Sequence, residues 1–153
     1  MKKLTFICLA FMIATAGYGQ NINSIVNKFK NESKVTYVSL NEELMPAELK
    51  AKGVERIDIL LFDDCDTAVK EKYNQTVSTL KFTQFKNLLN LKNEGLNISI
   101  YFKEAGEKVS ELVLFMTGDE PKLIRGVGAV NKAELDEALS GSMKEFSLDG
   151  ITL

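Results

Sequence analysis

The chain has 153 residues, a formal net charge of −2, and no histidine or tryptophan. This length fits one domain with its own hydrophobic core. The missing histidine excludes Ser-His-Asp and Cys-His catalysis and any histidine-bearing zinc site, and scattered lysines on an acidic chain argue against nucleic acid as a partner.

The first 19 residues have the pattern of a secretory signal peptide, with two lysines, an apolar run over 4–16 and small residues before Gln20. We expect cleavage after Gly19, which takes the net charge to −4, and a periplasmic or extracellular protein. The apolar run is shorter than the about 20 residues of a stable membrane span, although a retained anchor is the alternative. Cys8 lies at the front of that run, so we expect no lipidation.

Residues 20–153 then alternate helical and strand patterns. Apolar residues at helical spacing predict a helix over 22–32, and β-branched residues predict a strand over 35–40. Pro46 interrupts the crossing segment that follows. Over 54–62, Ile57, Ile59 and Leu61 share one face and Arg56, Asp58, Leu60 and Phe62 share the other, which predicts an interior strand nearly covered on both sides.

After this strand, helical spacing begins at Val69 and continues to Leu89 with a break near 78–81, and Gly95 is placed to end the helical stretch. Strict alternation over 96–102 predicts a strand with Leu96, Ile98, Ile100 and Phe102 inward and Asn97, Ser99 and Tyr101 outward.

Turn residues at 104–107 and 117–121 join this strand to two more, so 96–130 is predicted as a three-stranded antiparallel meander. Asn131 and Glu134 have capping-box spacing for a final helix that Gly141 ends. The elements predict a single α+β domain over 20–153: a mostly antiparallel sheet of about five strands, with helices packed on one face.

The second half resembles a known family, the domain-of-unknown-function family 4252. The resemblance rests on I-x-I-Y-F at 98–102, a turn with Gly106, E-L-V-L at 111–114 and L-I-R-G-V-G at 123–128. It implies a small exported protein of Gram-negative bacteria with no assigned activity, and it transfers no site residue.

Asp63, Asp64 and Asp66 follow the interior strand and surround Cys65. An apolar strand followed by Asp-x-Asp resembles the first motif of haloacid-dehalogenase-type phosphatases, in which Asp64 would attack phosphorus and Asp66 would act as general acid and base with magnesium. Thr117 and Asp119 would complete such a site. The predicted antiparallel hairpins and the short chain after Thr117 argue against it.

Two further interpretations of these acids remain. They begin a helix, where carboxylates cap free N–H groups and meet the positive end of the helix dipole, or they bind calcium or magnesium adventitiously. Cys65 is predicted to be a half-buried structural residue, because nearby carboxylates disfavour a thiolate.

Arg125 lies between apolar residues and either pairs with an acid on a neighbouring strand or faces a ligand. Gly126 and Gly128 mark a bulge or a close backbone approach. The hypothesis from sequence is a non-enzymatic module that binds an envelope protein or a small ligand through the open face or an edge of its sheet, without a cofactor. The alternative is a metal-dependent phosphohydrolase using Asp64 and Asp66. The sequence does not indicate the oligomeric state of the protein.

Overall fold

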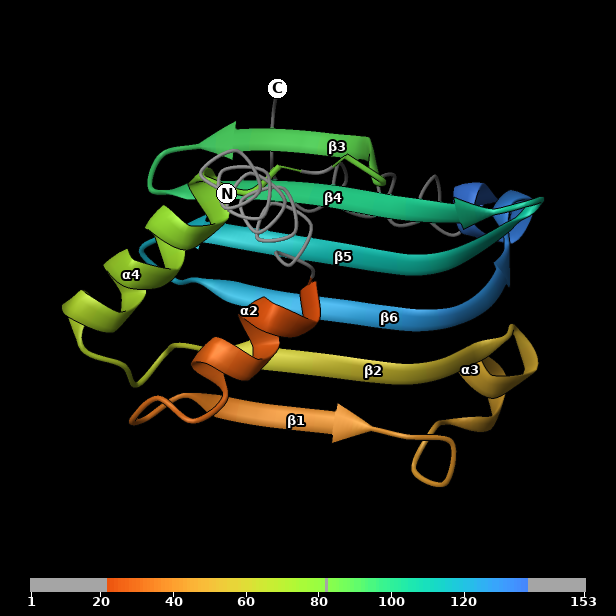
Figure 1. Ribbon diagram of the computed structural model, residues 1–153, viewed down its shortest axis with the longest axis horizontal. Helices are drawn as coiled ribbons and strands as arrows, with labels where there is room; N and C mark the ends of the chain where they lie inside the picture. The colour runs from red at the N-terminus through yellow and green to blue at the C-terminus, as the bar shows by residue number, and fades with distance from the viewer. Residues whose placement is uncertain (1–21, 82, 138–153) are drawn as a thin grey trace, which may run out of the picture.

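The computed structural model describes residues 22–81 and 83–137. Its elements in chain order are α2 (Ile22–Phe29), β1 (Thr36–Leu40), α3 (Ala47–Ala51), β2 (Val54–Leu61), α4 (Thr67–Ser78), β3 (Lys86–Asn93), β4 (Leu96–Ala105), β5 (Lys108–Gly118) and β6 (Lys122–Asn131). Residues 132–137 are also helical. The strands form one six-stranded sheet of order β1-β2-β6-β5-β4-β3 (Figure 1). Every neighbouring pair is antiparallel, which confirms the α+β class.

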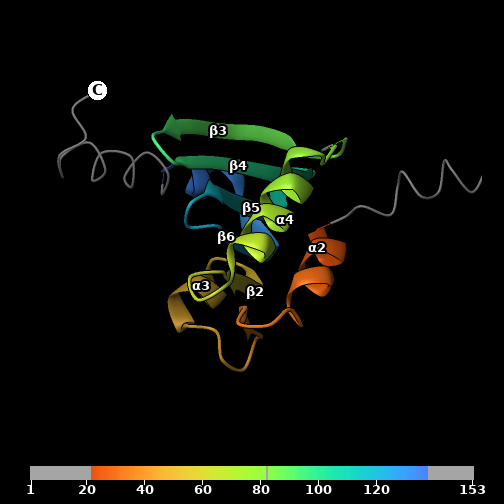
Figure 2. The same ribbon diagram turned by 90° about the vertical axis from the view of Figure 1, so that its left-hand side faces the viewer.

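Helices α2 and α4 lie on the same side of the sheet (Figures 1 and 2). The apolar residues of α2 recur at intervals of three and four, so all of them face the sheet and are buried: Ile22, Ile25, Val26 and Phe29. Tyr73 of α4 is fully buried, and its ring centroid lies 5.5 Å from that of Phe29 and 4.4 Å from that of Phe62. These three rings join both helices to the end of β2.

The strands supply the rest of this core from the face of the sheet that α2 and α4 cover. Leu123 on β6 lies between Leu60 on β2 and Phe115 on β5 in the strand register, and all three side chains are at most 1% exposed. Since side chains alternate along a strand, this register defines the helix-covered face. Residues that pair with Leu123 share its face, and their neighbours in sequence lie on the other face.

The predicted helix over 22–32, the strands over 35–40 and 54–62, and the meander over 96–130 are confirmed. The helical stretch ending at Gly95 is wrong in its second half, because Lys86–Asn93 is strand β3. Leu89 and Leu91 pair with β4, and Gly95 has φ +71° in the hairpin turn. Pairing with β4 overrides the helical spacing, and the sheet gains a sixth strand.

Burial along β4 follows the predicted alternation, since Ile100 and Phe102 are each 7% exposed, but these residues lie on the face opposite α2 and α4. Tyr101 packs under them, with its ring centroid 6.2 Å from that of Phe115. Ile100 pairs with Leu114, so it lies on the other face together with Phe102. The alternation in β4 separates an apolar row from the row of Asn97, Ser99 and Tyr101, but it does not tell which row the helices cover.

At the end of β6, Ala133 N–H donates to the side-chain oxygen of Asn131 at 3.1 Å, which fits the predicted helix start. The predicted helix end at Gly141 and the signal peptide lie outside the described residues. Over the described part of the chain, no helix combines the length and apolar character needed to cross a membrane.

Candidate functional site

The three acids before α4 are exposed and do not converge. The Asp63 carboxylate lies 4.0 Å from Lys122 Nζ, and the Asp66 carboxylate lies 3.5 Å from Lys34 Nζ. Asp66 occupies the N-cap position of α4, as the helix-start interpretation requires, but its side chain makes no capping hydrogen bond. Within 22–81 and 83–137, no group of three or more acidic or cysteine side chains is placed to hold a metal ion.

Cys65 is buried rather than half-buried, and its thiol donates to the Ser33 carbonyl at 3.7 Å. Burial raises the pKa of the Cys65 thiol, so the thiolate is disfavoured. Thr117 lies near the end of β5, and the Asp119 N–H donates to the Gly95 carbonyl in the adjoining turn. These residues sit in antiparallel hairpins, whereas the phosphatase interpretation requires a parallel sheet of β-α units.

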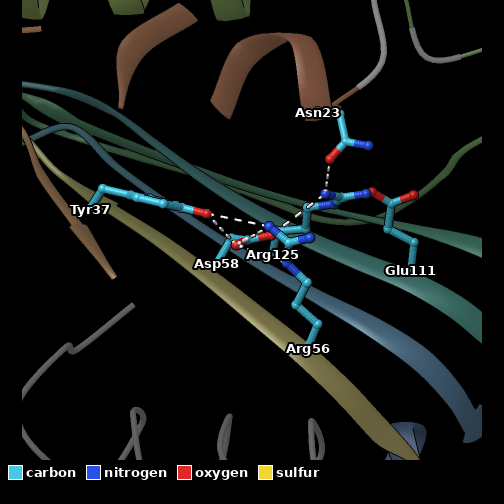
Figure 3. A network of polar contacts seen from close by, with 6 residues as sticks. All are labelled: Asn23, Tyr37, Arg56, Asp58, Glu111 and Arg125. Carbon is cyan, nitrogen blue, oxygen red and sulfur yellow. Dashed lines mark hydrogen bonds and ion pairs between the residues drawn. The ribbon is translucent and has the colours of Figure 1, made fainter. Parts of the chain in front are cut away.

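A network of polar side chains lies between α2 and the sheet (Figure 3). Its centre is Asp58 on β2, which is fully buried. Asp58 Oδ1 accepts hydrogen bonds from Tyr37 OH at 2.9 Å, and from Arg56 Nε at 3.2 Å and Nη2 at 3.1 Å. Its other oxygen, Oδ2, lies 3.6 Å from Arg125 Nη1.

Arg125 on β6 connects this centre to its surroundings. Its Nε donates to the Glu111 carboxylate on β5, and its Nη1 donates to the Asn23 side-chain oxygen on α2. Arg125 is 8% exposed. The sequence interpretation that Arg125 pairs with an acid on a neighbouring strand is therefore confirmed twice, once on each side of β6.

The network has two positive and two negative side chains, so its net charge is zero: Arg56, Arg125, Asp58 and Glu111. Hydrogen bonds to Tyr37 and Asp58 raise the pKa of Arg56, so its charge is held firmly. A buried charge is tolerated when it is paired and hydrogen-bonded. The network therefore acts as an internal clamp that joins α2, β1, β2, β5 and β6.

The opposite face of the sheet, called the open face below, is not covered by α2 or α4 (Figure 2). Ile124 belongs to it, because it pairs with Ile59 and Leu114 next to the fully buried Leu123 row. The strand register extends this face to an apolar set across all six strands: Val38, Ile57, Ile59, Leu89, Leu91, Ile98, Ile100, Phe102, Leu112, Leu114, Met116 and Ile124.

Several of these side chains are exposed, with exposed fractions of 38% for Val38, 39% for Ile124 and 45% for Leu91. Charged groups on the open face lie at its margins. Lys122 pairs with Asp63 at one strand end, and Lys86 on the edge strand pairs with Glu104. The middle of the face is therefore apolar; Ile124 is exposed there, whereas Ile100 and Phe102 are buried at 7% exposure.

A cavity of about 230 Å³ hollows the open face beside α3 and residues 132–137. Leu49, Leu112, Gly126 and Leu135 are among its lining residues. A Cβ added at Gly126 would meet no atom within 4 Å, whereas one at Gly128 would lie 2.1 Å from the Gly53 carbonyl oxygen. Gly128 thus confirms the close backbone approach expected from sequence, and Gly126 leaves a hollow.

Comparison with known families supports the resemblance noted from sequence. A family described as a domain of unknown function (DUF4252) matches residues 29–138. The chain belongs to the DUF4252 family. The match spans β1 to β6, so it includes the clamp residues on the sheet and the whole open face of this DUF4252 domain. Neither the curated proteins nor the solved structures gave a match to the chain.

Proposed function

We propose that this DUF4252 protein is an exported, non-enzymatic binding module that engages a protein partner through the open face. The observation that carries the proposal is the apolar open face, on which Val38 and Leu91 on the edge strands and Ile124 on the central strand β6 are exposed. A contiguous apolar surface of this kind in a small domain is characteristic of an interaction site. Export is supported by the signal-peptide pattern over residues 1–19.

The two faces of the sheet differ in how well they suit the binding of a partner. On the helix-covered face, the clamp pairs its charges within the chain: Asp58 Oδ2, which accepts no hydrogen bond, lies 3.6 Å from Arg125 Nη1, and Arg125 donates to protein groups on two elements. A substrate site needs polar groups directed at the ligand rather than at one another. The open face offers shape and apolar area on rigid strands, which suits recognition of a complementary protein surface.

The test is site-specific photocrosslinking in intact cells. A photoreactive side chain at Ile124 samples the open face, and the same side chain at Leu44, which is 65% exposed in the loop after β1, is the control. We expect a discrete crosslinked protein species from position 124 and none from position 44. A chain that stays uncrosslinked at position 124, at native expression, would refute a role in protein binding through this face.

A further inference from the structure

We propose that the open face pairs with the same face of a second copy, with Ile124 of each copy inserted into the hollow at Gly126 of the other. This inference rests on the proposed function and names the partner. Its basis is that one strand carries both a protruding side chain and a hollow. Ile124 is 39% exposed, and Gly126 leaves open space on the same face.

The spacing of these two positions makes the face complementary to itself. Ile124 and Gly126 lie two residues apart on β6, which is about 6.6 Å along a strand. Consider a two-fold axis that lies midway between two facing sheets, runs perpendicular to the strands and passes over β6 at Arg125. This axis places Ile124 of one copy opposite Gly126 of the other. Each Ile124 then lies over the partner's Gly126, which is the reciprocal contact of an isologous dimer.

Neighbouring strands follow the same symmetry. Ile59 and Leu114 flank Ile124, and Ile57 and Leu112 flank Gly126. The axis that exchanges Ile124 with Gly126 therefore places one apolar row against the other across β2, β6 and β5. Two sheets packed face to face about 10 Å apart, with strands nearly aligned, are a common arrangement.

The size of the cavity favours a side chain over a small molecule. Its volume of about 230 Å³ is below the roughly 300–1,000 Å³ of ordinary ligand pockets. Gly126 has neither a positive φ nor a crowded Cβ position to explain it. A glycine inside a strand often marks a bulge, a tight bend or a close approach by another chain or ligand, and the open space at Gly126 fits a close approach.

The available area also fits a second copy. Six strands about 4.8 Å apart and about eight residues long present roughly 600–700 Å², against about 800 Å² per partner in a standard interface. The margins carry Lys122 beside Asp63 and Lys86 beside Glu104. Each of these two lysines is already paired with an acid of its own chain, so neither brings an unpaired charge to the margin of the interface.

The elements that stand above the open face, α3 and residues 132–137, are compatible with this arrangement. Helix α3 and residues 132–137 border the cavity on the open side, near the end of β6 (Figure 1). The two-fold axis reverses the direction of β6 in the second copy. These raised elements of the two copies therefore lie at opposite ends of the paired sheets.

The experiment is sedimentation equilibrium of the purified protein over a concentration series, with substitutions that move the protrusion. Gly126→Ile fills the hollow, and we expect a folded monomer, because a Cβ added at this position meets no atom within 4 Å. Ile124→Ala is expected to weaken dimerisation at least about tenfold. The double variant Ile124→Ala/Gly126→Ile exchanges protrusion and hollow and is expected to restore the dimer.

Leu44→Ala removes an exposed apolar side chain away from the sheet and is expected to leave dimerisation unchanged. Circular dichroism of each variant confirms folding. A monomeric wild-type protein, or a double variant no better than Gly126→Ile alone, overturns the inference. So does photocrosslinking from position 124 into residues 138–153 of the same chain. A monomer that still crosslinks another protein from position 124 overturns the second-copy inference and leaves the proposed function standing.

Discussion

The two faces of this sheet differ in which side chains are buried and which are exposed. The helix-covered face includes a fully buried carboxylate, Asp58, and an almost fully buried guanidinium, Arg125, which pair with each other. The open face carries no charge at its centre and exposes Ile124. On the helix-covered face, buried polar groups are paired within the chain, whereas on the open face the apolar side chain of Ile124 stays exposed. Four measurements test this contrast.

The largest expected effect is from Asp58→Ala. Removing this carboxylate leaves Arg125 buried with a partner missing and deprives Tyr37 and Arg56 of their acceptor. Breaking one side of a buried ion pair costs about 3–5 kcal/mol. We expect a loss of that order in the free energy of unfolding measured by urea titration.

A double-mutant cycle sharpens this result. Replacing both partners, as in Asp58→Leu with Arg125→Met, removes both charges and should recover part of the loss. If Asp58→Ala alone changes the free energy of unfolding by less than about 1 kcal/mol, then the clamp is not what holds the helix-covered face together.

The next effect compares the two strand glycines. Gly128→Ala places a Cβ 2.1 Å from the Gly53 carbonyl oxygen, so the backbone must shift. Overpacking of this kind costs about 1–3 kcal/mol. Gly126→Ala meets no neighbour and should be neutral or stabilising by about 0.5–1 kcal/mol. Thermal unfolding of both variants gives the comparison, and equal losses would contradict the hollow at Gly126.

A smaller effect concerns Tyr73, whose hydroxyl donates to the Lys122 carbonyl at 2.9 Å. Tyr73→Phe should cost about 1 kcal/mol at pH 7. Burial raises the pKa of Tyr73 far above its ordinary value of 10.0.

The raised pKa gives this residue a pH signature. Above pH 10 the unfolded chain releases the phenol proton while the folded chain keeps it, so stability falls by up to about 1.4 kcal/mol per pH unit. Below pH 10 both states hold the proton, and the contribution is constant. Urea unfolding at pH 7 and pH 11 should show a shallower decline for Tyr73→Phe than for wild type.

The smallest effects are expected at the acids before α4. The ion pair between Asp66 and Lys34 is exposed on both sides, and such pairs contribute about 0–1 kcal/mol. Asp66→Asn should leave the unfolding temperature nearly unchanged, with or without millimolar magnesium or calcium.

A metal effect at these acids would contradict that expectation. A cation that binds only the folded state at a hundredfold excess over its Kd adds about 2.7 kcal/mol. Such a stabilisation, abolished by Asp64→Asn or Asp66→Asn, would revive the metal and phosphohydrolase interpretation. Turnover of an aryl phosphate with magnesium, lost in Asp64→Asn, would establish it.

Much of the fold could be predicted from local pattern. The helix with Ile25 and Phe29, the strand after Gly53 and the meander all follow from apolar spacing and turn residues. Strand β3 could not be separated from a helix in this way, because Phe85, Leu88 and Leu89 also fit helical spacing. The usable signal was the alternation of Leu89 and Leu91 with polar neighbours just before the turn at Gly95.

The clamp and the open face depend on strand order, which is not a local property. Arg125 was recognisable as a charge between apolar residues, but its partners Asp58 and Glu111 become neighbours only once β6 lies between β2 and β5. Similarly, the pattern of β2 indicated burial on both faces, and the pattern of β4 indicated one apolar and one largely polar face. The face that the helices cover depends on how α2 and α4 are connected to the strands, and the residue pattern within a strand does not indicate this.

The central position of β6 has a consequence for how the chain folds. Ile57 pairs with Gly126, so the sheet joins residues far apart in sequence, and such long-range pairing is formed slowly. Until β6 is available, β1 and β2 are not connected to β3, β4 and β5 through the sheet. A chain synthesised from its N-terminus therefore completes this sheet only once β6 has been made.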